Sequence, residues 1–295
     1  MQETLAADGV KPAKKTGPRV SLRRTTSGIL VHLIIITAAV LIGFPFFYML
    51  STSLKTVQEV YTIPMVILPA APQWRNFVEV WNLLPFGRFT FNSVVYTVSI
   101  TFGEFMMGLM AGYAFARLRF PKKDLIFFLV LLTFLIPGEI TLIPRFIMLK
   151  QLNWINTYPG LIVPELSSAF ATFLLREHFQ SLPDELFDAA KIDGAGYFRQ
   201  LMQIALPLSK PIVSTLLLLA FVAHWNAYMW PLVVTNSQSM RTLPIGVQSL
   251  RDVFEFPEWQ YIMAGATIVV MPLVALFLIA QKQFIEGAVQ GALKG

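Results

Sequence analysis

The chain has 295 residues, of which 55% are hydrophobic and only 14% are charged, with a mean hydropathy of +0.61 and a formal net charge of +6. Because a soluble domain carries about 25% charged residues, this composition is that of a membrane protein. The absence of cysteine excludes disulfides and thiolate metal sites. The basic residues lie beside apolar segments rather than in one stripe, so a nucleic-acid partner is rejected.

The first 27 residues are polar and hold six Lys/Arg and two acidic residues. This composition predicts a disordered cytoplasmic tail over 1–27. The apolar run 29–50 that follows has 22 residues, enough to cross a hydrocarbon core of about 30 Å. It is too long for the h-region of a secretory signal peptide, and no small-residue cleavage site closes it.

Five further apolar segments predict an all-α, polytopic membrane protein with six transmembrane helices. Residues 211–233 and 261–281 carry no charged residue, whereas 91–116, 124–148 and 157–176 each carry one glutamate. We therefore expect a permease-like membrane domain over 28–285. A short C-terminal tail, 286–295, follows it.

The distribution of basic residues predicts the orientation of these spans. With six spans both termini lie on one side, and a cytoplasmic placement of the termini puts 16 of the 23 Lys/Arg inside. The positive-inside rule favours this arrangement. The loop between spans four and five is then also cytoplasmic.

That loop, 181–207, holds the densest cluster of charge in the chain and predicts a helix–glycine–helix elbow. We expect Ser181 to cap a short helix that Gly194 ends, because glycine accepts the left-handed conformation at a helix C-terminus. A second short helix over 197–204 would close at Pro207. A partner gripping the first helix could then move span five as a rigid body. A plain amphipathic loop packed on its own helices fits these patterns equally well.

The same loop resembles the EAA loop of binding-protein-dependent ABC import permeases, the element that a cytosolic ATPase grips. The matching residues are Pro183, Glu185, Leu186, Ala189, Ala190, Asp193, Gly194, Ala195, Phe198, Leu206 and Pro207. Asp188 departs from the pattern, since the family usually has glutamate there, and the shorter arm could weaken or shift a salt bridge. By this resemblance the ATPase-docking residues are Glu185, Asp188, Ala189, Ala190, Asp193, Gly194, Ala195 and Pro207.

The resemblance extends over most of the chain, to the MalG-type sugar permeases, through Asn92-Ser93, 114–120, 225–232 and 281–295. It implies the type I ABC importer permease fold (MetI/MalG-like) in the cytoplasmic, inner membrane of a prokaryote. In that group the C-terminal tail reaches into the ATPase dimer. By resemblance, Gly291, Lys294 and Gly295 would make this contact here.

The sequence contains no P-loop of the form Gly-x-x-x-x-Gly-Lys-Ser/Thr and no catalytic constellation. We therefore expect the chain not to be an enzyme and to bind no cofactor, with ATP and Mg held by a partner ATPase. The resemblance implies three protein partners. They are an ABC ATPase dimer, a second homologous permease and an extracytoplasmic solute-binding protein.

Glu104, Glu139 and Glu165 are candidates for the translocation pathway, because ionisable residues inside a membrane usually face a bundle interior or a wet cavity. Pro137-Gly138 and Pro144 predict a kinked or partly unwound span around Glu139. The other interpretation of all three is a protonated or paired structural glutamate.

Trp225, Asn226 and Tyr228 are further pathway candidates, since aromatic faces suit a sugar ring and an amide can bond its hydroxyls. An ordinary interfacial aromatic belt explains them equally well. Two outside segments, 51–90 and 234–260, could meet the binding protein. We favour 234–260, because in maltose-type relatives the loop before the last span inserts toward the binding protein's pocket.

The sequence thus predicts the permease of an ATP-driven importer of a mono- or oligosaccharide. Glycerol-3-phosphate or another polyol derivative is the alternative cargo, although a phosphate would need a basic pathway residue and spans one, five and six offer none. A remote alternative is an ion-gradient-driven secondary transporter with the three glutamates as its relay. It leaves the elbow unexplained.

Overall fold

The computed structural model describes the backbone of residues 22–292, which in that range forms helices and loops without a strand. Contacts divide the chain into two units, Met1–Tyr48 and Met49–Gly295. The first unit contributes most of α1 (Leu22–Ser53). Its side chains over 30–47 are all exposed, and Leu30–Ser53 has a mean hydropathy of 2.4, which confirms the first predicted span.

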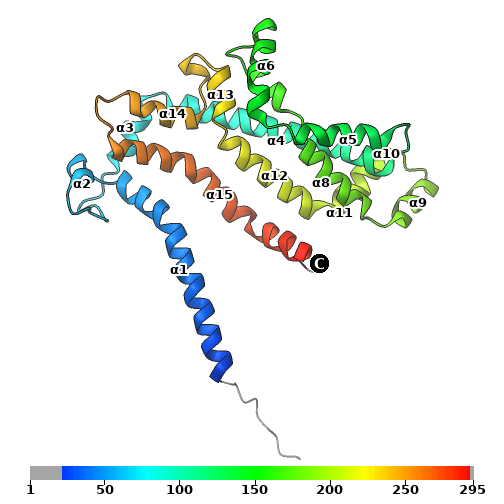
Figure 1. The fold of residues 1–295 in the computed structure, drawn as a ribbon, viewed down its shortest axis with the longest axis horizontal. Coiled ribbons are helices and arrows are strands. Elements are labelled where there is room, and N and C mark those ends of the chain that lie inside the picture. The colour runs from blue at the N-terminus through cyan, green and yellow to red at the C-terminus, as the bar shows by residue number, and fades with distance from the viewer. Residues whose placement is uncertain (1–21, 293–295) are drawn as a thin grey trace, which may run out of the picture. The chain divides into compact units, whose positions relative to one another are not determined.

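The second unit continues in chain order (Figure 1) with α2 (Val57–Tyr61), α3 (Arg75–Leu83), α4 (Phe86–Arg117), α5 (Lys123–Phe134), α6 (Gly138–Gln151), α7 (Tyr158–Ile162), the 3-10 turn η1 (Val163–Glu165), α8 (Ala169–Gln180), α9 (Asp184–Ile192), α10 (Tyr197–Gln200), the π-helical η2 (Leu201–Ala205), α11 (Leu206–Leu208), α12 (Lys210–Trp225), α13 (Met229–Val234), η3 (Gln238–Met240), α14 (Leu243–Ser249), η4 (Leu250–Asp252) and α15 (Trp259–Ala292).

Six candidate membrane spans are present in the described residues when each bent helix pair counts as one span. Four are single segments: Leu30–Ser53, Phe86–Arg117, Tyr158–Gln180 and Trp259–Gln281. The two bent pairs are α5 with α6, at 96°, and the 197–208 segment with α12, at 83°. The first bend confirms the kink predicted beside Pro137. On this count the number of spans agrees with the prediction, but the second bent pair includes the 197–208 segment that the sequence analysis placed in a loop.

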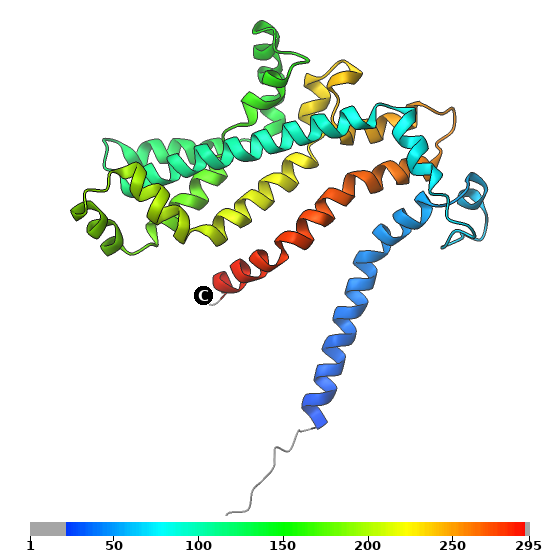
Figure 2. The same ribbon diagram turned by 180° about the vertical axis from the view of Figure 1, so that it is seen from behind.

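The long helix α4 runs through the second unit, with α8 and α12 packed along it (Figures 1 and 2). Two glycines allow α8 to approach. A Cβ on Gly108 would lie 2.9 Å from the Cβ of Ala171, and one on Gly112 would lie 2.9 Å from the Cβ of Leu175. Small residues four positions apart let membrane helices pack backbone to backbone. The buried cluster around this contact holds Phe105, Leu109, Tyr113, Ala171, Leu175, Phe179 and Phe187.

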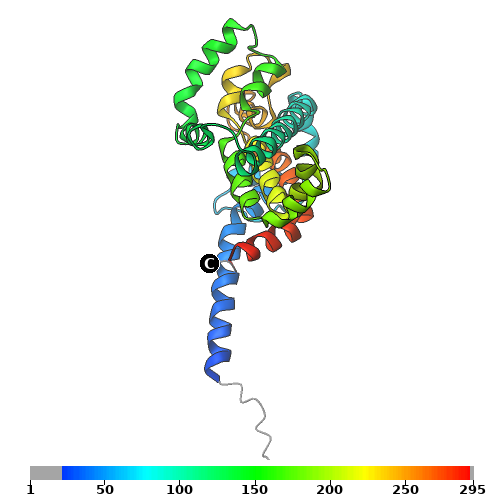
Figure 3. The same cartoon turned by 90° about the vertical axis from the view of Figure 1, so that its right-hand side faces the viewer.

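The last long helix, α15, packs against α12 and α3, and a second buried cluster lies among them. By contrast, α6 stands away from the group formed by α4, α8 and α12 (Figure 3). Several of its large apolar side chains are therefore exposed in this chain, for example Ile140 and Ile143.

The fifth predicted span, 211–233, is wrong as one continuous helix. α12 ends at Trp225, residues 226–228 are not helical, and α13 restarts at Met229. Pro231 gives the physical reason. Its ring would clash with the carbonyl of Ala227 in a continued helix, and it has no N–H to donate there.

The C-terminal helix α15 continues to Ala292, so it covers much of the segment 286–295 expected as a tail. Gly291 lies in its last turn, beyond the residues whose side chains are described. Lys294 and Gly295 lie outside the described residues. Their contact with an ATPase stays a prediction.

Candidate docking elbow and translocation site

The 183–208 segment forms the predicted elbow. Its first helix, α9, ends as expected, with Gly194 at a left-handed φ of +77°. The Gly194 N–H donates to the Lys191 carbonyl at 3.0 Å, and the Ala195 N–H donates to the Ala190 carbonyl at 2.8 Å. These bonds satisfy carbonyls at the helix end, which is the usual role of a glycine at this position.

Two details of the predicted elbow are wrong. Ser181 ends α8 rather than capping α9, because its hydroxyl donates to the His178 carbonyl at 2.8 Å. Pro207 does not close the second helix, which continues to Leu208. The chain passes the proline through a π turn in which the Leu206 N–H donates to the Leu201 carbonyl, shifting the bonding by one residue.

Arg117, the last residue of α4, holds the start of the elbow. Its guanidinium pairs with Asp184 and donates to the carbonyls of Phe179 and Leu182, both at 2.6 Å. It also lies 4.1 Å from the ring centre of Phe187 on α9. One side chain thus fixes the end of α8, the connecting residues and the first helix of the elbow.

A second set of contacts holds the far arm. The Tyr113 hydroxyl of α4 donates to Gln200 at 3.2 Å, and the Gln200 amide donates to the Ala195 carbonyl at 2.6 Å. Phe187 is 3% exposed and packs at 6.4 Å, centre to centre, from Tyr113. Both arms are therefore tied to α4, which makes the elbow a stiff extension of the helix group.

Most of the expected docking residues face outward. Glu185, Asp188, Ala189, Asp193, Gly194 and Pro207 are exposed, and Ala195 is half-buried. Ala190 is different, because it is only 9% exposed and packs against its own chain. Lys191 donates a 2.8 Å hydrogen bond to Asp188, and this bond lowers the pKa of that carboxyl.

The predicted docking residues did not include the apolar part of this outward face, although Phe198 belongs to the matched motif. Ile192 is 87% exposed and Phe198 is 71% exposed, on either side of Gly194. Tyr197 lies beside them and is also exposed. Large apolar residues at the ends of two short helices around a glycine were the available signal. An exposed apolar patch rimmed by charges is typical of a protein contact.

Two of the three candidate glutamates lie in polar pairs that join different elements of the second unit. Glu104 on α4 is 3.2 Å from His224 Nε2 on α12. Glu165, in η1, pairs with Arg145 on α6, whose guanidinium stacks 4.0 Å from the ring centre of Trp230.

The Tyr96 ring lies 6.2 Å from that of His224, within electrostatic reach of Glu104, Arg145 and Glu165. This brings the two pairs into one polar region.

Glu139 does not join this region, since it is exposed in the first turn of α6. Arg145 and His224 were not predicted as pathway residues. Their partners lie on other helices, so no local pattern pointed to them.

Of the three residues in the aromatic run, Trp225 does not suit a pathway. It is 2% exposed, stacks on Phe221, and its indole N–H donates to the Val269 carbonyl at 2.9 Å. Asn226 is exposed at the end of α12, and Tyr228 is half-buried where α13 begins. In the described part of the chain no group of three or more His, Asp or Glu could hold a metal ion.

Residues 104–287 match the family described as the inner membrane component of binding-protein-dependent transport systems. The chain belongs to this family. The match covers most of the chain, including the elbow and both polar pairs. The protein is therefore a multi-pass, inner-membrane transport permease, and its resemblance to ABC import permeases is confirmed.

Similar proteins agree with this assignment. The permease is 36% identical over 268 residues to the sn-glycerol-3-phosphate transport system permease protein UgpE of Yersinia enterocolitica, covering 88% of this chain and 95% of that one. It is 33% identical over 276 residues to the protein of the same name from Brucella abortus, covering 91% and 98%.

A solved chain of a bacterial ABC transporter involved in alginate import superposes with a TM-score of 0.79 at 21% identity, covering 91% of this permease and 100% of that chain. A second, from the alginate transporter complexed with its pentasaccharide-bound periplasmic protein, gives 0.61 at 14% identity, covering 89% and 98%. These two similarities show the fold, that of an ABC importer permease.

Proposed function

We propose that this permease works in an ATP-driven importer and carries a carbohydrate that an extracytoplasmic binding protein delivers. The observation that carries the proposal is the elbow, which α4 holds through Arg117 and Tyr113 while its charged and apolar residues face outward. The relatives are named for the uptake of sn-glycerol 3-phosphate and of alginate, and both of these compounds are hydroxylated, which supports this cargo class.

In this proposal the elbow docks on a cytosolic ABC ATPase, and both termini are cytoplasmic. A second, homologous permease presents an equivalent elbow to the other ATPase subunit. ATP and Mg in those subunits supply the energy. When the subunits close, the two elbows approach each other, and α12 turns with the elbow because the buried Ser209 joins them without a loop.

The binding protein is proposed to meet the 234–260 segment. Its tip is held in place, since the Tyr61 hydroxyl of α2 donates to the Pro257 carbonyl. Phe254, Phe256 and Trp259 line a cavity of about 610 Å³ with Tyr61. A partner could bury these aromatic faces, which dominate the energetics of many interfaces.

A phosphorylated polyol is the second candidate cargo. Arg145 supplies the basic side chain that spans one, five and six lack, and its pairing with Glu165 could be exchanged for pairing with a phosphate. Replacing Arg145 with Gln should reduce uptake of sn-glycerol 3-phosphate while sparing a neutral sugar. Equal uptake of sn-glycerol 3-phosphate by the unmodified chain and by the Arg145→Gln variant would show that Arg145 does not recognise the cargo.

The test of the docking elbow is a matched glycine pair. Gly194 and Gly196 both have open space where a Cβ would be added, but only Gly194 has a positive φ. We expect Gly194→Val to disturb the elbow and Gly196→Val to leave it intact, because a β-branched residue is strained at positive φ. The measurement is ATPase recruitment and binding-protein-stimulated ATP hydrolysis in liposomes.

Loss of recruitment in Gly194→Val alone, with normal membrane insertion, supports docking at the elbow. If both variants recruit and couple like the unmodified chain, the elbow is only a loop. Cargo movement by the chain without any ATPase would instead favour a gradient-driven transporter, with Glu104 and Glu165 as the relay. The proposed tail contact is tested by deleting 291–295 in the same assay.

A further inference from the structure

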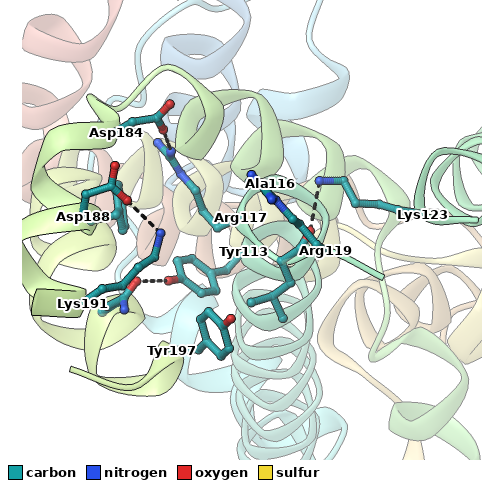
Figure 4. A pocket seen from close by; sticks show the side chains of 12 residues that line it. Tyr113, Ala116, Arg117, Arg119, Lys123, Asp184, Asp188, Lys191 and Tyr197 are labelled. Atoms are coloured by element: carbon teal, nitrogen blue, oxygen red, sulfur yellow. Dashed lines mark hydrogen bonds and ion pairs between the residues drawn. The ribbon is translucent and has the colours of Figure 1, made fainter. Parts of the chain in front are cut away.

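A cavity of about 590 Å³ lies between the end of α4 and the elbow (Figure 4). This size falls within the range of roughly 300–1,000 Å³ that small-molecule sites occupy. Its polar lining comes from three places in the chain. These residues are Tyr113, Arg117, Arg119 and Lys123 and, on the elbow, Asp184, Asp188, Lys191, Tyr197 and Gln200.

The charges of this cavity do not balance. Asp184 pairs with Arg117, and Asp188 pairs with Lys191. Arg119 and Lys123 remain without a carboxylate partner among the described residues. Within the part of the chain that the structure describes, the only polar contact of Lys123 is a 3.2 Å hydrogen bond to the Leu118 carbonyl. Two cationic side chains are therefore available to an anion.

The position of the cavity along the spans favours one source of that anion. Arg117 is the last residue of the apolar helix α4, and Lys123 is the first residue of α5. Both residues thus mark the place where a membrane span meets its connecting turn. Lipid phosphates lie at this level, and basic pockets between transmembrane helices bind anionic headgroups.

One free hydroxyl group adds hydrogen-bond capacity. Tyr197 is 59% exposed and lines the cavity, whereas the Tyr113 hydroxyl already donates to Gln200 (Figure 4). Cationic side chains can pair with the two unesterified, charged oxygens of a phosphodiester, and a hydroxyl group can donate a further hydrogen bond. Arginine is well suited to the first role, because its planar fork matches phosphate geometry.

We propose that this cavity binds the phosphate headgroup of an anionic phospholipid, with Arg119 and Lys123 as its principal charges. The bound headgroup then lies against the α4 end and the elbow. Lipid composition would thereby affect the stiffness of the proposed docking element. The binding itself does not depend on the importer function.

The experiment measures phospholipid retention by the full-length, detergent-purified chain with native mass spectrometry, using phosphatidylglycerol and phosphatidylcholine. The test protein is Arg119→Gln/Lys123→Gln. Its matched control is Lys122→Gln/Arg199→Gln, which removes the same charge from exposed residues of the same region that do not line the cavity. A Lys123→Arg variant keeps the charge and checks that the turn tolerates substitution.

We expect phosphatidylglycerol to bind about 25-fold more weakly to the test protein, at roughly fivefold per charge, and normally to the control and to Lys123→Arg. Equal binding by both double variants, or equal retention of phosphatidylcholine, would overturn the proposal. Displacement of the lipid by millimolar inorganic phosphate would instead identify a site for free phosphate, and would overturn the lipid assignment.

Discussion

The guanidinium of Arg117 joins α4 to the elbow by pairing with Asp184 while donating to two backbone carbonyls. The two kinds of contact differ in burial. The Arg117 side chain is 12% exposed, whereas that of Asp184 is 83% exposed. Water screens the ion pair on one side, so the carbonyl bonds are the stronger part of the anchor.

Replacing Arg117 with Gln should therefore loosen the elbow. Hydrogen bonds from a charged donor to buried acceptors contribute roughly 1.5–3 kcal/mol, and we expect a loss of stability of about 3 kcal/mol. Hydrogen exchange of the 183–196 amides measures it. Asp184→Asn is the control and should cost less than about 1 kcal/mol. An equal loss of stability in both variants would show that the ion pair, and not the carbonyl bonds, holds the elbow.

The contact between α4 and α8 depends on Gly112. A Cβ there meets Leu175 at 2.9 Å and the Arg176 backbone nitrogen at 3.1 Å, so Gly112→Val must push the helices apart. We expect a loss of several kcal/mol, seen as a lower melting temperature in detergent. Gly43→Val in α1, where nothing lies within 4 Å, should melt normally. A normal melt for both variants would contradict the described packing.

Trp225 and Asn226 should separate structural from transport effects. Truncating the buried indole by Trp225→Ala should cost about 3–5 kcal/mol, through lost packing and the unpaired Val269 carbonyl. Asn226→Ala should leave melting unchanged, because the side chain is exposed, and should lower uptake if the amide contacts cargo. Thermal melting and liposome uptake measured together make the distinction. A stable Trp225→Ala protein would refute the core assignment.

The loop around Glu59 should weaken in acid. The amides of Thr56 and Ala70 donate to its carboxylate at 2.8 Å, and these bonds lower its pKa below the ordinary 4.5. Because the folded-state pKa is depressed, the stabilisation is fully present above 4.5 and is lost as pH falls through the folded value. Amide exchange at Thr56 and Ala70 between pH 6 and 3 should show this loss.

Glu59→Gln provides the control for the acid effect. Its side chain carries no titrating charge, so amide protection at Thr56 and Ala70 should be lower at pH 6 and should follow only the ordinary chemistry of exchange below it. Acid loosening of equal size in Glu59→Gln would assign the effect to another group.

Much of the architecture could be predicted from sequence, because hydropathy and glycine or proline positions act locally. The long apolar runs predicted the spans, Pro137 predicted the bend before α6, and Gly194 predicted the end of α9. Each of these outcomes depends on a residue and its immediate neighbours. The π turn before Pro207 was not predicted, because α-helical and π-helical hydrogen bonding are compatible with the same sequence pattern.

The polar pairs could not be predicted, since they join residues that are distant in the chain. Glu104 and Glu165 were identified as unusual, but His224 and Arg145 became their partners only through the packing of α12 and α6. The sequence also did not determine whether the face of α12 that carries Trp225 would be buried or exposed. An aromatic residue near a span end suits the interface or the core, and neighbouring helices decide between them.

The 83° turn at Ser209 makes the elbow and α12 two arms of one bent lever that pivots at this residue. α12 has 16 residues and is therefore about 24 Å long. A rotation of about 10° about the turn would sweep the far end of such an arm through about 4 Å. Asn226 follows that end directly and Tyr228 lies two residues further on, so a rotation of the elbow would displace both of these pathway candidates.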